Sequence, residues 1–349
     1  MQEIEHLERC KLLIYIILFV ALNVTYSQNL HYNKSVEHGV HRLLNEEFDK
    51  ARKNFKSYGQ IDSTIFPEVL LLITDVFEWE HDNNAILTGA VDSSIIRLKD
   101  STETLLKKNS ENLEFNYTLA LIMSASAYWE AFRNNYLKSF ADGFIARQYF
   151  EKCLTLDTTS IEYQCAIGNY KYWSSIKTES LHWLPFVFDE SKSGLNELEL
   201  CLSEKFFIAE FMKFSLAWAY LNENLFEEAE LLIKDLIKRY PKSLKAKILQ
   251  AAYLEHFDQT RSLNLYNTIL AKYKEADIVN SAREIELSYR IADLNFRLNN
   301  FEKSIEICQH YIDDADTNAA YYEALKLNID EFVKLRDTLI TTKSALPEN

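Results

Sequence analysis

The sequence predicts an all-α fold, a solenoid of antiparallel helix pairs, from its composition, its periodicity and its internal repeats. The 349 residues include only six Gly and four Pro, where average usage gives about 24 and 17. Sheets and tight hairpins need Gly for positive φ angles, and loop-rich folds need Pro for rigid turns. Apolar residues recur at helical spacing from residue 36 onward, as in Ala229, Leu232, Ile233 and Leu236. We therefore expect long helices joined by short polar turns.

A short repeated motif indicates where the helix pairs turn. An Asn-containing turn is followed by an aromatic residue and, three positions later, by a small residue. The clearest copies are Asn134-Asn135-Tyr136 with Ser139, Asn224-Leu225-Phe226 with Ala229, and Asn299-Asn300-Phe301 with Ser304. A small residue lets two antiparallel helices approach closely, and bulky apolar residues fill the space beside it. Because one pair cannot bury its apolar face alone, the pairs must stack.

These residues resemble the tetratricopeptide repeat, a helix–turn–helix unit of about 34 residues. The best copy runs from about Glu210 to Pro241, with Leu216, Ala217, Tyr220, Ala229 and Ile233 at the family's characteristic positions and Lys213 where the family has Trp. Residues 36–274, which include FADGFIARQYFEKCLTLD and AIGNYKYW, are similar to a group of exported bacterial tetratricopeptide-repeat proteins, largely uncharacterised. The resemblance implies a right-handed superhelical solenoid and export. It implies no activity.

The N-terminus has the pattern of a signal peptide. Residues 12–24 are thirteen uncharged, mostly apolar residues preceded by Arg9 and Lys11, which is too short for a comfortable transmembrane helix. We expect cleavage after Ser27; the alternative is an uncleaved signal anchor. Cys10 lies before the apolar run, so lipidation is disfavoured and a periplasmic or extracellular location is expected. The expected organisation is a signal peptide over 1–27, a disordered start over 28–35, helical repeats over 36–317, and a capping helix with a C-terminal tail over 318–349.

Composition argues against several classes of function. The net charge of −14 disfavours nucleic acid as a partner. P-loop, HExxH, GxSxG and dinucleotide-binding motifs are all missing from the sequence, so we predict no enzyme activity, no cofactor and no metal. The four cysteines after the signal peptide are too sparse for a disulfide scaffold. Cys153 and Cys165 could pair in an oxidising compartment, but small buried apolar residues are the favoured interpretation.

Three local features allow a functional and a structural interpretation. His38 and His41 share a helix face without an obvious third ligand, so ordinary polar positions are favoured over a metal site. The acidic run from Glu78 to Asp82 is interpreted as a helix end exposed to water. Residues 181–189, LHWLPFVFD, could grip a partner or touch a membrane surface peripherally, but a connection folded over the core is favoured.

The default binding surface of such a solenoid is the groove lined by the first helix of each pair. By register with the repeat, the candidates are Tyr128, Asn169, Tyr172, Phe214, Trp218, Leu221, Tyr289, Asp293 and Phe296. Aromatic residues there would anchor a peptide segment. We therefore predict a non-enzymatic exported scaffold that binds a protein or peptide partner in an envelope or secreted assembly. The alternatives are a solenoid that binds a glycan or small molecule, and an enzyme built from scattered carboxylates.

Overall fold

The computed structural model describes residues 34–82, 85–179, 188–203, 205–275, 281–317 and 326–345, and within these ranges every regular element is a helix. The prediction of an all-α helical-repeat fold is thus confirmed. The elements are α2 (Lys34–Leu44), α3 (Phe48–Gly59), α4 (Phe66–Asp82), α5 (Ala85–Lys108), α6 (Leu113–Phe132), α7 (Tyr136–Leu156), α8 (Ile161–Lys177), α9 (Ser191–Leu198), the 3₁₀ helix η2 (Glu199–Leu202), α10 (Ala209–Asn222), α11 (Phe226–Arg239), α12 (Leu244–Leu254), α13 (Gln259–Glu275), α14 (Ser281–Arg297), α15 (Phe301–Thr317) and α17 (Lys326–Ala345).

The same backbone turn joins the two helices of four pairs. Asn134, Asn224 and Asn299 have φ angles of 58°, 57° and 62°, and Glu46 has 59° in the turn between α2 and α3. In each turn the next backbone N–H donates to the carbonyl five residues before it, at 2.8–2.9 Å. A left-handed residue followed by this hydrogen bond is the Schellman motif that ends many helices. The repeated Asn-containing turn of the sequence is therefore a repeated helix stop.

Small residues of the second helices lie against the first helices, as the motif predicts. The hydroxyl oxygens of Ser139, Ser262 and Ser304 donate to backbone carbonyls eleven or twelve residues earlier, at 2.7–2.8 Å. Ala51 and Ala229 occupy the equivalent positions in their pairs and are fully buried. A larger side chain at any of these positions would push the two helices of its pair apart, because the interior is close-packed.

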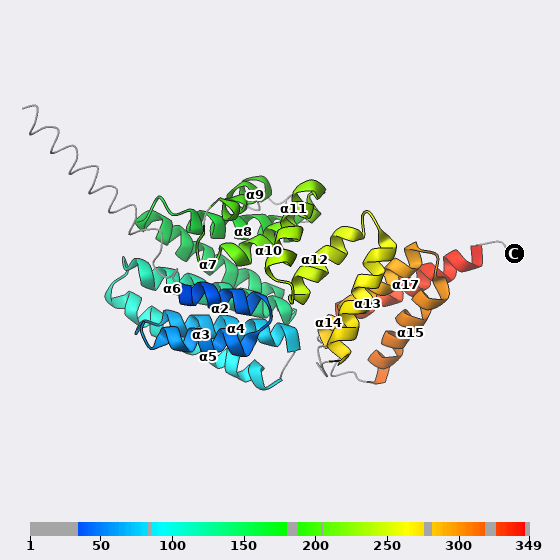
Figure 1. Ribbon diagram of the computed structural model, residues 1–349, viewed down its shortest axis with the longest axis horizontal. Helices are drawn as coiled ribbons and strands as arrows, with labels where there is room; N and C mark the ends of the chain where they lie inside the picture. Colours follow the sequence, from blue (N-terminus) through cyan, green and yellow to red (C-terminus); the bar gives the residue numbers. More distant parts are fainter. Residues whose placement is uncertain are drawn as a thin grey trace, which may run out of the picture.

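The buried apolar residues form three main clusters, and each cluster adjoins the next. One large cluster runs from α2 to α12, a second joins α12, α13 and α14, and a third joins α14, α15 and α17. Trp218 packs against both the first and the second cluster. Figure 1 shows α12 between a larger body formed by α2–α11 and a smaller one formed by α13–α17. The junction at α12 is therefore where the two bodies are held together.

Several predicted segments lie outside the described residues. These are the signal peptide (1–27), residues 28–33 of the expected disordered start, and residues 181–187 of the LHWLPFVFD stretch. In the part of the chain that the structure describes, none of the helices combines the length and apolar composition that a membrane span requires. The helix α17 falls inside the range predicted for the capping helix.

Candidate functional site

Two of the nine predicted groove residues are core residues. Tyr172 is fully buried, and its hydroxyl donates to Oε1 of Glu223 at 2.9 Å and accepts from Asn222 at 2.9 Å. Leu221 is 8% exposed and belongs to the large apolar cluster. The prediction that these two side chains line an exposed groove is wrong, because Tyr172 packs against α10 and Leu221 is part of the buried core.

The other seven predicted groove residues are half-buried, or just exposed in the case of Tyr128. Most of them contact a neighbouring helix: the Asn169 amide accepts from Ser215 at 2.5 Å, and the ring centroids of Phe214 and Tyr240 are 5.8 Å apart. Their part in binding stays a prediction. The seven are Tyr128, Asn169, Phe214, Trp218, Tyr289, Asp293 and Phe296.

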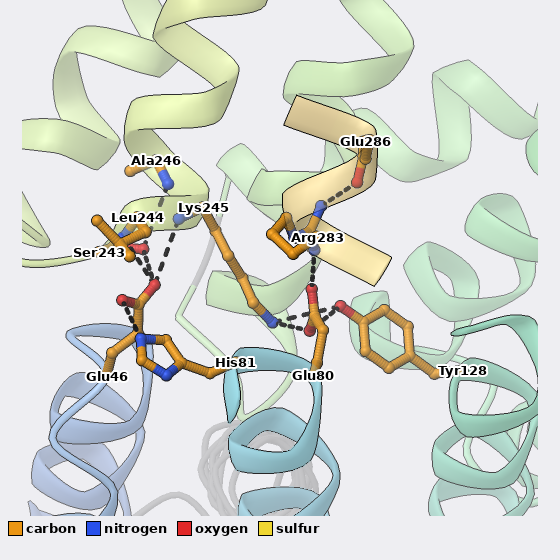
Figure 2. A network of polar contacts seen from close by, with 10 residues as sticks. All are labelled: Glu46, Glu80, His81, Tyr128, Ser243, Leu244, Lys245, Ala246, Arg283 and Glu286. Atoms are coloured by element: carbon orange, nitrogen blue, oxygen red, sulfur yellow. Dashed lines mark hydrogen bonds and ion pairs between the residues drawn. The ribbon is translucent and has the colours of Figure 1, made fainter. Parts of the chain in front are cut away.

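A buried carboxylate joins the two bodies at α12. Glu80, at the end of α4, is 5% exposed. Its Oε2 accepts from the hydroxyl of Tyr128 at 2.7 Å and from the ammonium of Lys245, and its Oε1 accepts from Arg283 at 2.8 Å (Figure 2). These partners come from α6, α12 and α14. The interpretation of this acidic run as a helix end in water is therefore wrong at Glu80.

Aromatic rings lie beside Lys245 and Arg283, the two cations that pair with Glu80. The Lys245 ammonium lies 3.7 Å from the centroid of Phe77, which stacks on Tyr128 with a centroid separation of 5.5 Å. The Arg283 guanidinium lies 5.7 Å from the Phe132 ring and is also paired with Glu286 at 2.6 Å. Cation–π contacts strengthen when the cation is removed from water. The space between α4, α6, α12 and α14 is thus filled by packed and paired groups.

A second carboxylate caps α12. Oε1 of Glu46 accepts from the backbone N–H of Leu244 at 2.7 Å and of Lys245 at 3.3 Å, and the hydroxyl of Ser243 donates to it at 3.4 Å (Figure 2). A carboxylate at a helix N-terminus satisfies unpaired N–H groups and opposes the positive end of the helix dipole. The left-handed turn at Glu46 therefore holds the start of α12 against the α2–α3 pair.

His81 completes the junction beside Glu46. Its Nε2 lies 3.5 Å from Oε2 of Glu46, and its Nδ1 contacts Asp82. Burial lowers the pKa of His81, but hydrogen bonds to Asp82 and Glu46 outweigh burial and raise the pKa to about 9. The imidazole is therefore a cation at neutral pH. Sequence reasoning missed this junction because the contacts that α12 and α14 make with Glu46 and Glu80 join residues separated by 165 positions or more.

The histidine pair near the N-terminus lies beside an arginine. His38 and His41 line a shallow hollow of about 250 Å³ together with Arg42 and Asn54. A guanidinium beside the two rings would repel a divalent cation. Within the described residues, no group of three or more His, Cys, Asp or Glu side chains is placed to hold a metal ion.

Among the described residues, a group of exposed aromatic side chains lies along α7. Tyr136, Phe140 and Phe144 are 53%, 46% and 47% exposed, and Leu137 beside them is 89% exposed. Their spacing of four places them on one face of the helix. The rings of Phe140 and Phe144 lie 6.0 and 6.5 Å from Tyr170 on α8. We call Tyr136, Leu137, Phe140 and Phe144 the α7 aromatic face.

The opposite side of α7 supplies the core, through Ala146, Phe150 and Cys153. The helix is therefore apolar on two sides, and among the described residues the α7 aromatic face is only partly covered, by Tyr170 of α8. Sequence analysis did not single out the α7 aromatic face, because aromatic residues at helical spacing usually indicate a buried side. One feature of the sequence could have identified it. The apolar residues of α7 extend around more of the helix than the side that packs against α6 and α8.

The helix pairs and their turns define an all-α helical-repeat protein of tetratricopeptide-like architecture. No protein-family model matches the chain, and no curated protein sequence does. Among solved structures, the chain is similar to the crystal structure of yeast Tom70, with 15% sequence identity and a TM-score of 0.37, over 93% of this chain and 80% of that one. The fold class therefore rests on the helices and turns described above.

Proposed function

We propose that this chain is a non-enzymatic scaffold that binds a protein partner through the α7 aromatic face. The carrying observation is the contiguous exposure of Tyr136, Leu137, Phe140 and Phe144 on one helix. Soluble proteins seldom leave several large apolar side chains together in water unless something binds them. Aromatic side chains also give much contact area for little loss of conformational entropy, which makes them effective anchors.

The partner chemistry follows from the shape and charge of this face. Tyr136 to Phe144 spans about 12 Å along the helix axis at 1.5 Å per residue. The charged groups beside it are already paired: Lys138 with Glu130, and Arg147 with Glu190 at 2.7 Å. A partner therefore gains little from opposite charge and much from apolar contact. An amphipathic helix that lays about two turns of its apolar stripe along α7 fits these conditions.

Export belongs to the same proposal. The signal-peptide pattern of residues 1–27 supports a partner in the periplasm or outside the cell, within an envelope or secreted assembly. The acidic net charge supports a protein rather than a nucleic acid as that partner. Binding of a glycan instead of a protein is an outcome that the experiment below distinguishes.

The test compares two surface variants of the mature chain in the source cells. In the first, Phe140→Ala and Phe144→Ala are combined; in the second, Leu231→Ala removes an exposed apolar side chain (70% exposed) on α11. After crosslinking and pull-down, we expect the same partner with wild type and with Leu231→Ala, and at least a tenfold loss with the α7 variant. Crosslinked peptides should come from an apolar helical segment of that partner.

The contrary results are equally specific. Equal recovery with all three proteins would show that the α7 aromatic face does not bind the partner. A glycan array signal that depends on Phe140 and Phe144, without a protein partner, would replace the proposal with a carbohydrate-binding function. Circular dichroism and thermal unfolding of each variant control for folding, and the exposed positions predict melting temperatures close to that of wild type.

A further inference from the structure

Two glycines bring α8 and α9 into backbone contact. A Cβ atom added at Gly168 would lie 2.7 Å from the backbone nitrogen of Leu198 and 2.8 Å from the carbonyl oxygen of Gly194. A Cβ added at Gly194 would lie 2.8 Å from the carbonyl oxygen of Gly168. Only glycine fits at such an approach. The two helices are thus closer here than an ordinary helix pair.

This contact brings two cysteines together one turn further along. Cys165 precedes Gly168 by three residues on α8, and Cys201 follows Leu198 by three residues on η2. Because the helices run antiparallel, moving one turn back on α8 and one turn forward past α9 leads to facing positions. The Cys165 thiol contacts the Leu198 carbonyl at 3.5 Å, and Cys201 is its neighbour. Both thiols are fully buried.

We propose that Cys165 and Cys201 form a disulfide as the chain folds in an oxidising compartment, which fastens η2 to α8. The sequence alone left open a pairing of Cys153 with Cys165. The structure instead directs the Cys153 thiol to the carbonyl of Leu113, at 3.9 Å. Cys308 belongs to the separate cluster of α14, α15 and α17. Cys201 is therefore the partner that the helix register offers to Cys165.

The chemistry requires a small-molecule disulfide such as glutathione disulfide as the oxidant. One cysteine thiolate attacks a sulfur of the oxidant, which forms a mixed disulfide and releases one glutathione thiolate. The second cysteine thiolate attacks the protein sulfur of the mixed disulfide, which forms the Cys165–Cys201 bond and releases the second glutathione. The two cysteines lose two electrons and two protons, and the oxidant gains both.

The timing follows from burial. Burial, together with the adjoining Cys201 thiol, raises the pKa of Cys165 well above its ordinary value. The thiolate is the reactive form, so the folded reduced protein reacts slowly. Oxidation should therefore occur while α8 and η2 assemble, before the thiols are covered. The resulting disulfide would close a covalent ring of the chain that contains residues 166–200.

The experiment is refolding of the full mature chain in glutathione disulfide, followed by alkylation, trypsin digestion and mass spectrometry. Cleavage after Lys and Arg places Cys153 and Cys165 in one peptide, residues 153–171, and Cys201 in residues 193–205. We expect the two peptides to appear as one disulfide-linked species. Its mass should be two units below the summed masses of the two reduced peptides. The link should persist in Cys153→Ser and disappear in Cys165→Ser.

Several results would overturn the proposal. One is a peptide link that disappears in Cys153→Ser. Another is Cys201 that carries glutathione as the final product. A third is alkylation of both Cys165 and Cys201 in a chain whose circular dichroism shows that it has refolded. The wild-type peptide map gives the answer by itself, so it does not depend on whether a variant folds. As a second readout, oxidised wild type should melt at least about 5 °C above its reduced form, and Cys201→Ser should show no such difference.

Discussion

Replacing Glu80 by Ala should destabilise the junction at α12 strongly. The change removes the carboxylate that accepts from Tyr128, Lys245 and Arg283. The side chains of Lys245 and Arg283 are only 20% and 11% exposed, so water cannot fully replace the lost partner. Breaking a buried ion pair from one side costs about 3–5 kcal/mol. Because Arg283 keeps Glu286, we expect about 3 kcal/mol of lost unfolding free energy.

A matched control lies on the same helix. Glu68 of α4 pairs with Arg97 at 2.6 Å, but both side chains are about half exposed. Exposed pairs contribute about 0–1 kcal/mol, so Glu68→Ala should be nearly neutral. Urea unfolding gives the free energies, and hydrogen exchange of peptides from α12 and α14 reports whether the junction opens first. Equal losses in the two variants, or no faster exchange in α12 and α14 of Glu80→Ala, would refute the reasoning.

Three further perturbations test particular residues. His81 has a folded pKa of about 9, raised from 6.5, so its contribution is complete below pH 6.5 and is lost as the pH rises through 9. The stability difference between wild type and His81→Gln should shrink by about 3 kcal/mol from pH 6 to pH 10 in urea unfolding, and a constant difference would contradict it. Burial raises the pKa of Glu162 to about 7. Its ionisation therefore lowers the unfolding free energy of wild type as the pH rises from 4.5 through 7. Relative to wild type, the unfolding free energy of Glu162→Gln should rise by about 3 kcal/mol between pH 4.5 and 8. An unchanged difference would contradict this expectation. Asn224 has a φ of 57°. Asn224→Ala should lower the unfolding free energy by about 1 kcal/mol and Asn224→Gly should not, whereas equal losses would argue against the left-handed turn.

The parts of the fold that depend on local sequence could be predicted. Asn134, Asn224 and Asn299 are the left-handed residues that end α6, α10 and α14. Asn tolerates this conformation, and the aromatic residue that follows begins the next helix, so the signal lies within a few residues. The small residues at Ser139 and Ser304 follow from the same local pattern.

The junction could not be predicted, because its contacts join residues far apart in the sequence. Glu80 lies in an acidic run that looks like any solvated helix end until α12 and α14 bring Lys245 and Arg283 to it. Periodicity identifies a helix face but not the element that covers it. For that reason Tyr172 was expected in a groove and is buried, while Phe140 and Phe144 are exposed although their spacing resembles that of a core.

Partner binding at the α7 aromatic face can be observed in living cells by site-specific photo-crosslinking. A photoreactive phenylalanine analogue is placed at Phe140, and in a separate strain at Leu231 on α11. We expect one reproducible protein adduct at Phe140, mapped to an apolar helical segment of the partner, and no such adduct at Leu231. The same adducts at both positions, or an adduct only at Leu231, would contradict it.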